Sequence, residues 1–195
     1  DILRIIACFF VIINHTDNTM LLSLEPSARW FVSATMLYIC KVAVPLFIMI
    51  SGAVLLGKEE SYKDLYKKRV LRTALVIVVF SFVYYINMVI KKETAFSLKE
   101  FWQEILHVPI TNAYWYLYMY LGLMIMLPML RKLVKNMETK DYIYCLVIWT
   151  IFMGVFPIIN HYLEYKPITY CFNIPIISVY VIYFIMGYFI ENKLD

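Results

Sequence analysis

The sequence predicts an all-α protein, a polytopic transmembrane helical bundle with about six spans. Hydrophobic residues make up 63% of the chain and charged residues only 16%. In a typical soluble domain, about half of the residues are hydrophobic and about a quarter are charged. The apolar residues gather in long runs, and Tyr and Phe are frequent near the ends of the runs, as in the aromatic belts of membrane proteins.

Six apolar runs account for the predicted spans, and they lie at residues 2–14, 42–56, 70–90, 113–130, 142–159 and 174–190. Several are shorter than the roughly 20 residues that a membrane helix needs, and we expect the second to begin earlier, within 30–39. The segment 96–106 repeats apolar residues at helical spacing, which indicates a short helix lying in the membrane interface. No repeat or long linker divides the chain, so we expect one membrane domain over residues 1–195.

The basic residues predict how the spans are oriented. Connections rich in Lys and Arg stay in the cytoplasm, and the connections after the second and fourth runs have this composition. This orientation places most of the 18 basic residues on the cytoplasmic side, namely Arg4, Lys58, Lys63, Lys67, Lys68, Arg69, Arg72, Arg131, Lys132, Lys135, Lys140 and Lys193. Both ends of the stretch are therefore expected in the cytoplasm, with the protein in the cell (plasma) membrane.

Charge and cysteine usage argue against two kinds of partner. The net charge of +4 is small and dispersed along the chain, so we do not expect a nucleic-acid partner. The four cysteines and three histidines form no Cys-x-x-Cys pair and no cluster with the spacing of metal ligands. We therefore expect no metal site.

The first apolar run has an arginine near its start and a histidine just after its end. On an α-helix, Arg4 and His15 lie within about 20° of each other and roughly 16 Å apart along the axis. Ionisable groups at membrane depth are costly, so the pair indicates a functional site. The alternative interpretation is that Arg4 snorkels to the lipid headgroups and His15 caps the helix at the far interface.

A basic cluster opens the third run. Arg69 and Arg72 are three residues apart and share a helix face. Guanidinium groups match phosphate oxygens, so one interpretation is a site for an anionic cofactor. The other interpretation is an anchor for anionic lipid headgroups, and the residues alone favour this second one.

Taken in order, the motifs of the chain resemble those of the acyltransferase-3 family of integral membrane acyltransferases. The matching residues are Asp1-x-Leu3-Arg4, Arg4 followed after ten residues by His15, Val44-Pro45-Leu46-Phe47 leading to Ser51-Gly52, Arg69-x-x-Arg72, and Trp115-Tyr116-Leu117 with Pro128. The order and spacing of these motifs make the match specific. The family domain usually has more spans, so the resemblance implies that residues 1–195 are its amino-terminal part, truncated at both ends.

The resemblance implies an enzyme that transfers an acyl group, typically acetyl from cytoplasmic acetyl-coenzyme A. The acceptor would be a hydroxyl or amine on an extracytoplasmic glycan, lipid or cell-wall component, as in O-acetyltransferases that modify polysaccharides of the cell envelope. On this sequence, the resemblance makes His15 the catalytic residue and Arg4, Arg69 and Arg72 the residues that bind the coenzyme. His15 either takes the proton of the acceptor or is first acylated itself, and the sequence does not separate these mechanisms.

The alternative function is a secondary transporter or flippase of a small solute or glycan. Such proteins also place polar residues inside a helical bundle and use helices broken by Pro or Gly. No acidic residue lies in the middle of any of the six runs, so the sequence offers no evident site for coupling to protons or cations.

Single cysteines at Lys63, Lys135 and Glu93, in a background without the native cysteines, test the orientation. We expect Lys63→Cys and Lys135→Cys to react with an impermeant thiol reagent only from the cytoplasmic side, because their connections carry the basic residues. Glu93→Cys should react only from outside. Reversed labelling would contradict the orientation and would also move Arg69 and Arg72 away from cytoplasmic coenzyme A.

Overall fold

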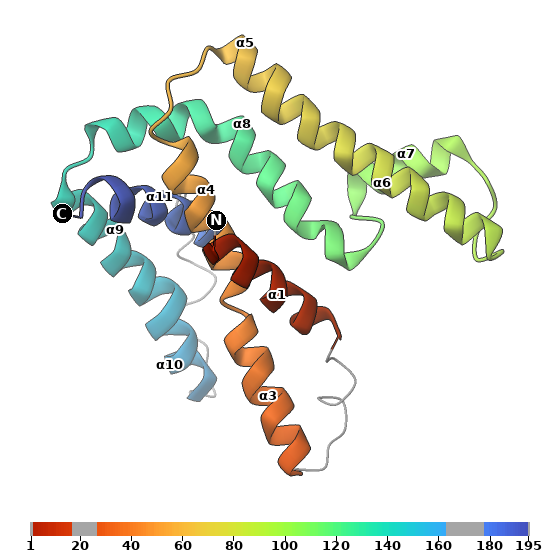
Figure 1. The fold of residues 1–195 in the computed structure, drawn as a ribbon, viewed down its shortest axis with the longest axis horizontal. Coiled ribbons are helices and arrows are strands. Elements are labelled where there is room, and N and C mark those ends of the chain that lie inside the picture. The colour runs from red at the N-terminus through yellow and green to blue at the C-terminus, as the bar shows by residue number, and fades with distance from the viewer. Residues whose placement is uncertain (1, 17–26, 163–177, 195) are drawn as a thin grey trace. The chain divides into compact units, whose positions relative to one another are not determined.

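The computed structural model describes residues 2–16, 27–162 and 178–194, and its regular structure in these ranges is helical without strands. The all-α prediction is thus confirmed. In chain order the elements are α1 (Ile2–Thr16), α3 (Ala28–Cys40), α4 (Ala43–Leu55), α5 (Tyr62–Leu65), the π-helical turn η1 (Tyr66–Val70), α6 (Leu71–Ile90), α7 (Leu98–His107), the 3-10 turn η2 (Asn112–Tyr114), α8 (Trp115–Asn136), α9 (Thr139–Thr150), the π-helical turn η3 (Ile151–Val155), α10 (Phe156–Tyr162) and α11 (Val179–Asn192) (Figure 1).

The apolar helical segments match the six predicted runs. Four are long and apolar enough to cross a membrane, and two shorter apolar helices, α1 and α11, accompany them. The second segment begins at Ala28, so the expected earlier start is confirmed, two residues before the predicted range of 30–39. Asp1 and residues 174–177, where the sixth run was predicted to begin, lie outside the described residues.

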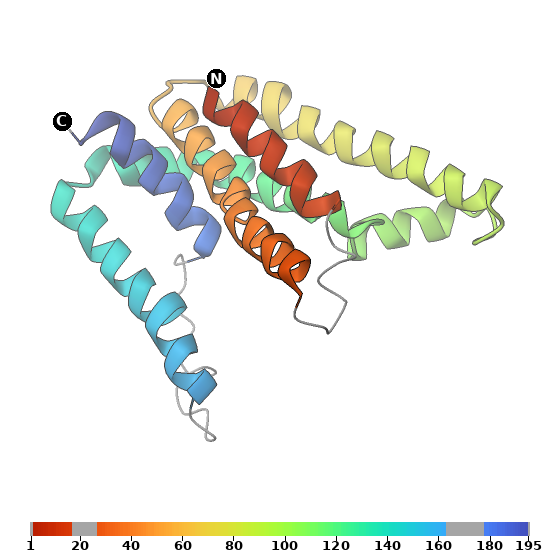
Figure 2. The ribbon, with the colours of Figure 1, turned by 60° about the horizontal axis from the view of Figure 1, so that its bottom comes forward.

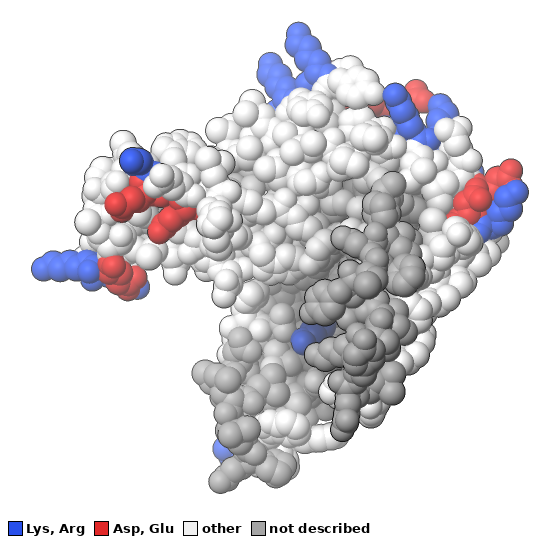
Figure 3. Space-filling view, turned by 180° about the vertical axis from the view of Figure 1, so that it is seen from behind, with Lys and Arg blue, Asp and Glu red and all other residues white. Residues whose placement is uncertain are grey.

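Much of the apolar surface of these segments is not covered by protein. In the four long segments, between 6% and 28% of the most apolar window is buried. On α1, the side chains of Ile2, Ile5, Phe9 and Ile12 are all more than half exposed. Figure 3 shows one face of the molecule on which wide areas carry no charged residue. Apolar surface of this extent is unfavourable in water and is suited to contact with lipid chains.

The described chain forms two compact units, one of residues 1–58 with 133–195 and one of residues 59–132. In the first unit the closest helix pair is α4 with α11; Figure 1 shows these two helices crossing, and Figure 2 shows them side by side. Glycines allow this approach. A Cβ atom on Gly52 would overlap the carbonyl oxygen of Phe184, and a Cβ atom on Gly187 would overlap the carbonyl oxygen of Met49. The two backbones are therefore in direct contact, as in membrane helix pairs with small residues at the crossing.

Two more helices pack on this pair. Helix α1 lies against α3 and α4, and its Ala7 is fully buried there, where a larger side chain would separate the helices. Helix α9 packs on α11 through the rings of Tyr142 and Phe189, whose centroids are 4.6 Å apart. These contacts fix α1, the helix that carries Arg4 and His15, against the α4–α11 pair.

The second unit is held by a cluster of apolar residues from three helices. Ile77 and Tyr85 of α6 are buried together with Phe101 and Ile105 of α7, and residues of α8 cover them. The Tyr85 hydroxyl accepts from the backbone N–H of Ser97 at 2.8 Å, which fastens the start of α7 to α6. The predicted short helix of this region is confirmed, whereas its position in the membrane interface stays a prediction.

Replacing glycine by alanine at the helix crossing tests the backbone contact. We expect Gly187→Ala to destabilise the protein by about 1–3 kcal/mol, because the added methyl group has no space and the helices must separate. The matched control is Gly122→Ala in α8, where a Cβ atom would meet nothing within 4 Å. The control should be neutral or gain up to about 1 kcal/mol from helix propensity. Thermal unfolding in detergent measures both, and equal stability of the two variants would contradict the contact.

Candidate active site

His15 lies in the last turn of α1. The helix is continuous from Ile2 to Thr16, and the Thr16 hydroxyl lies 3.0 Å from the Ile12 carbonyl oxygen, to which it donates. The His15 side chain is exposed, and Asn14 beside it is half-buried. The imidazole is therefore accessible to a reacting molecule rather than enclosed in the packing of the helices.

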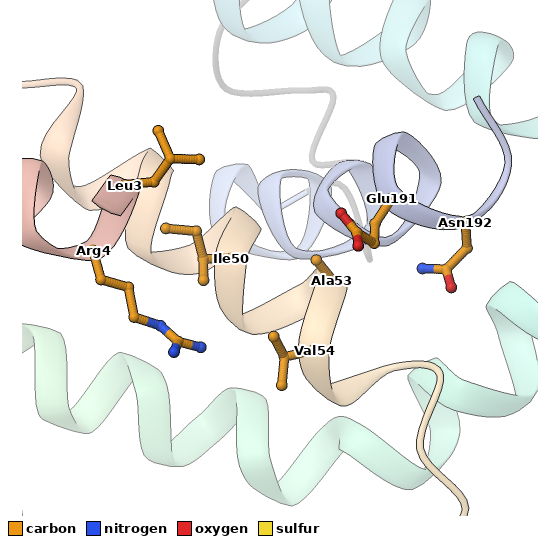
Figure 4. A pocket seen from close by; sticks show the side chains of 7 residues that line it. All are labelled: Leu3, Arg4, Ile50, Ala53, Val54, Glu191 and Asn192. Atoms are coloured by element: carbon orange, nitrogen blue, oxygen red, sulfur yellow. The ribbon is translucent and has the colours of Figure 1, made fainter. Parts of the chain in front are cut away.

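Arg4 lies in the first turns of the same helix and borders a cavity of about 390 Å³. Residues of three helices line this cavity: Leu3 and Arg4 of α1, Ile50, Ala53 and Val54 of α4, and Glu191 and Asn192 of α11. Figure 4 shows Arg4 at one end and Asn192 at the other, with the side chains of α4 between them.

The lining gives the cavity a mixed chemistry. It combines a guanidinium, a carboxylate and a carboxamide with an apolar wall. Ligand pockets usually measure about 300–1,000 Å³, so this cavity suits a small molecule or one part of a larger one. The α4–α11 contact shapes the site, because Ala53 follows Gly52 and the lining residues of α11 lie about one turn beyond Gly187.

Arg69 belongs to the second unit and is held by a carboxylate. Its Nε donates to Glu60 Oε2 at 3.0 Å, and its Nη2 donates to Glu60 Oε1 at 2.9 Å. Arg131 Nη2 also donates to Glu60 Oε2, at 3.0 Å. The three side chains are 24% (Arg69), 20% (Glu60) and 12% (Arg131) exposed, so the whole arrangement is largely buried. We call this group the Glu60 clasp.

The clasp keeps its carboxylate charged. The hydrogen bonds from Arg69 are the largest cause that lowers the pKa of Glu60, which reaches about 2. Partial burial acts in the opposite direction, while the Arg131 hydrogen bond and the charges of both arginines lower the pKa further. Glu60 therefore remains an anion at any physiological pH.

Arg72 stands apart from the clasp. It is the second residue of α6, its side chain is exposed, and it forms no ion pair with another described residue. The turn before it, η1, is π-helical: the N–H of Leu71 bonds to the carbonyl of Tyr66, five residues back. Such turns often occur at functional sites. Here the turn contains Arg69 and forms most of the basic cluster of residues 67–72.

The structure thus places the four predicted site residues in two pairs. Arg4 and His15 share α1 in the first unit, whereas Arg69 and Arg72 belong to the second. Glu60 and Arg131 were not singled out from the sequence, although they hold Arg69. The one feature of the sequence that could have indicated an ion pair here was Glu60 itself, an acidic residue near many lysines and arginines.

Comparison with known proteins gives one match. A search of curated proteins and a search of solved structures each found nothing similar. The model of one protein family, Acyl_transf_3, described as an acyltransferase domain, matches residues 1–195. This match agrees with the motif resemblance and with the apolar helices. The chain belongs to the acyltransferase-3 family of membrane acyltransferases.

Proposed function

We propose that the protein transfers an acetyl group from cytoplasmic acetyl-coenzyme A to a hydroxyl or amine on an extracytoplasmic glycan, lipid or cell-wall component. Its main support is helix α1, which carries Arg4 beside a cavity and an exposed His15 in its last turn. In this proposal the protein lies in the plasma membrane with both ends of the stretch in the cytoplasm.

The arginines bind the coenzyme in this proposal. Coenzyme A carries several phosphate groups, and arginine binds phosphate through two parallel N–H donors. Arg4, Arg69 and Arg72 are all near the helix ends that the basic residues assign to the cytoplasm. The cavity beside Arg4 has room for one part of the coenzyme, and its carboxylate and carboxamide offer hydrogen bonds to polar groups of the nucleotide.

His15 supplies the chemistry. As general base it takes the proton of the acceptor hydroxyl or amine while that oxygen or nitrogen attacks the carbonyl carbon of the thioester. The carbon–sulfur bond then breaks, and the coenzyme leaves as a thiolate that takes up a proton. In the second mechanism, the imidazole nitrogen attacks the thioester first, and the acceptor then attacks the acylated histidine. Both routes give the same products.

Substitution of His15 tests the catalytic role. In membranes containing the full protein, labelled acetyl-coenzyme A and acceptor, we expect His15→Ala to lower the transfer rate by about 10²–10⁴-fold, the usual cost of removing a general base. His15→Gln retains a hydrogen-bonding group but accepts no catalytic proton, so it should be similarly slow. Arg4→Ala should weaken coenzyme binding more than it lowers the rate at saturating coenzyme.

The three variants are compared at equal amounts in membranes. Near-parent turnover in His15→Gln would reduce the histidine to a structural residue. Solute flux without any acetyl transfer by the parent protein would instead support a transporter.

Replacement of Arg72 by lysine separates coenzyme binding from lipid anchoring. Lysine keeps the charge but loses the planar fork, so Arg72→Lys should weaken coenzyme affinity about tenfold if the residue grips a phosphate. The same change at Arg29, an exposed arginine in α3, is the control and should leave the affinity unchanged. A lipid anchor tolerates lysine, and equal affinity of Arg72→Lys and the parent would support that interpretation.

A further inference from the structure

The Glu60 clasp joins residues that are far apart in the chain. Glu60 precedes α5, Arg69 lies within the π-helical turn η1, and Arg131 lies near the end of α8, 71 residues beyond Glu60. One carboxylate oxygen, Oε2, accepts from both arginines. The start of α6 and the end of α8 therefore meet at one end of the second unit, where both carry basic residues.

The geometry of the clasp leaves part of Arg69 for another ligand. Glu60 occupies the edge of the guanidinium formed by Nε and Nη2. A guanidinium has five N–H donors, so the edge formed by Nη1 and the second hydrogen of Nη2 still points away from the carboxylate. This second edge has the two-donor geometry that suits phosphate. No other described residue forms an ion pair with Arg69.

The charges of the clasp also favour an anion. Two guanidinium groups share the Glu60 carboxylate, which holds two cations close together around one anion. The surrounding ion pair of Lys68 with Asp64 is neutral, and Arg72 adds a further cation nearby in sequence. Because the three clasp side chains are largely buried, their positions are fixed before a ligand arrives and little side-chain entropy is lost on binding.

We infer that Glu60 is a positioning residue that orients Arg69 and Arg131 to bind a phosphate group, and that Arg131 is a member of this phosphate site. The inference rests on the proposed function, in which the phosphate belongs to coenzyme A. An anionic lipid headgroup presents the same chemistry, so the experiment distinguishes the two sources.

Charge alone and positioning by Glu60 predict opposite changes in anion affinity when Glu60 is replaced by glutamine. Removing a negative charge from a basic cluster strengthens anion binding if only Coulomb attraction matters. Glu60→Gln should do the opposite, because its amide nitrogen cannot accept a hydrogen bond, so the two-point bond that orients the Arg69 guanidinium is lost. Asp64→Asn is the matched control, since Asp64 is exposed, lies four residues from Glu60 and forms its ion pair with Lys68 rather than with an arginine of the clasp.

The experiment measures binding of coenzyme A to the full protein in phosphatidylcholine nanodiscs. We expect Glu60→Gln to weaken the affinity about tenfold or more, and Asp64→Asn to bind as tightly as the parent or slightly more tightly. Unchanged or tighter binding by Glu60→Gln would overturn the inference, because Glu60 would then be a bystander or a competitor of the phosphate.

Pantetheine, which has no phosphate, distinguishes positioning from a general defect. The ratio of coenzyme A affinity to pantetheine affinity should fall in Glu60→Gln, whereas a damaged fold weakens both ligands alike and leaves the ratio unchanged. An unchanged ratio would overturn the inference. If Glu60→Gln does not fold, Arg131→Lys replaces it: the charge is kept, the fork is lost, and the same fall in the ratio is expected. An Arg131→Lys ratio equal to that of the parent would again overturn it.

A second set of nanodiscs containing phosphatidylglycerol identifies the source of the phosphate. If the parent retains phosphatidylglycerol and Glu60→Gln loses it, while neither binds coenzyme A, the positioning role stands and the proposed acyl donor is wrong. If the parent binds coenzyme A and only Glu60→Gln is impaired, both stand. A parent that binds neither ligand would overturn both.

Discussion

The constraint behind this structure is that a bilayer interior offers no hydrogen-bond partners to the backbone. Every long apolar segment that the structure describes is therefore helical, and even the irregular turns η1 and η3 keep their backbone bonds within the helix. Lipid chains are as apolar as leucine, so helices associate through close packing rather than through burial from water. The α4–α11 contact at Gly52 and Gly187 follows from this, and α1 and α9 pack on that pair.

The polar chemistry lies where this constraint is relaxed, at the ends of helices. Arg4 is near the start of α1 and His15 near its end, and the Glu60 clasp joins the start of one long segment to the end of another. The chain belongs to the acyltransferase-3 family, so these polar positions are candidates for the residues that carry out acyl transfer. In the reaction proposed above, cationic groups bind the donor and an accessible base serves the acceptor, and the described helices carry both kinds of group.

The features that could be predicted from the sequence are those with a local signal. Long apolar runs predicted the helical segments, the apolar spacing in 96–106 predicted α7, and the ten residues between Arg4 and His15 predicted their place on one helix. The Glu60 clasp had no such signal, because Glu60 and Arg131 are 71 residues apart and meet only in the folded chain. The role of Gly187 could not be predicted either, because it depends on contact with the Met49 carbonyl oxygen, which belongs to a helix far away in the sequence.

The glycine contact has a consequence for the order of events during synthesis. Gly52 and Gly187 are roughly 130 residues apart, and ribosomes add about 5–20 residues per second, so α4 waits on the order of 10 s for its partner. During this time the small-residue face of α4 has no matching backbone to contact. The first unit therefore reaches its final packing only after α11 has been inserted.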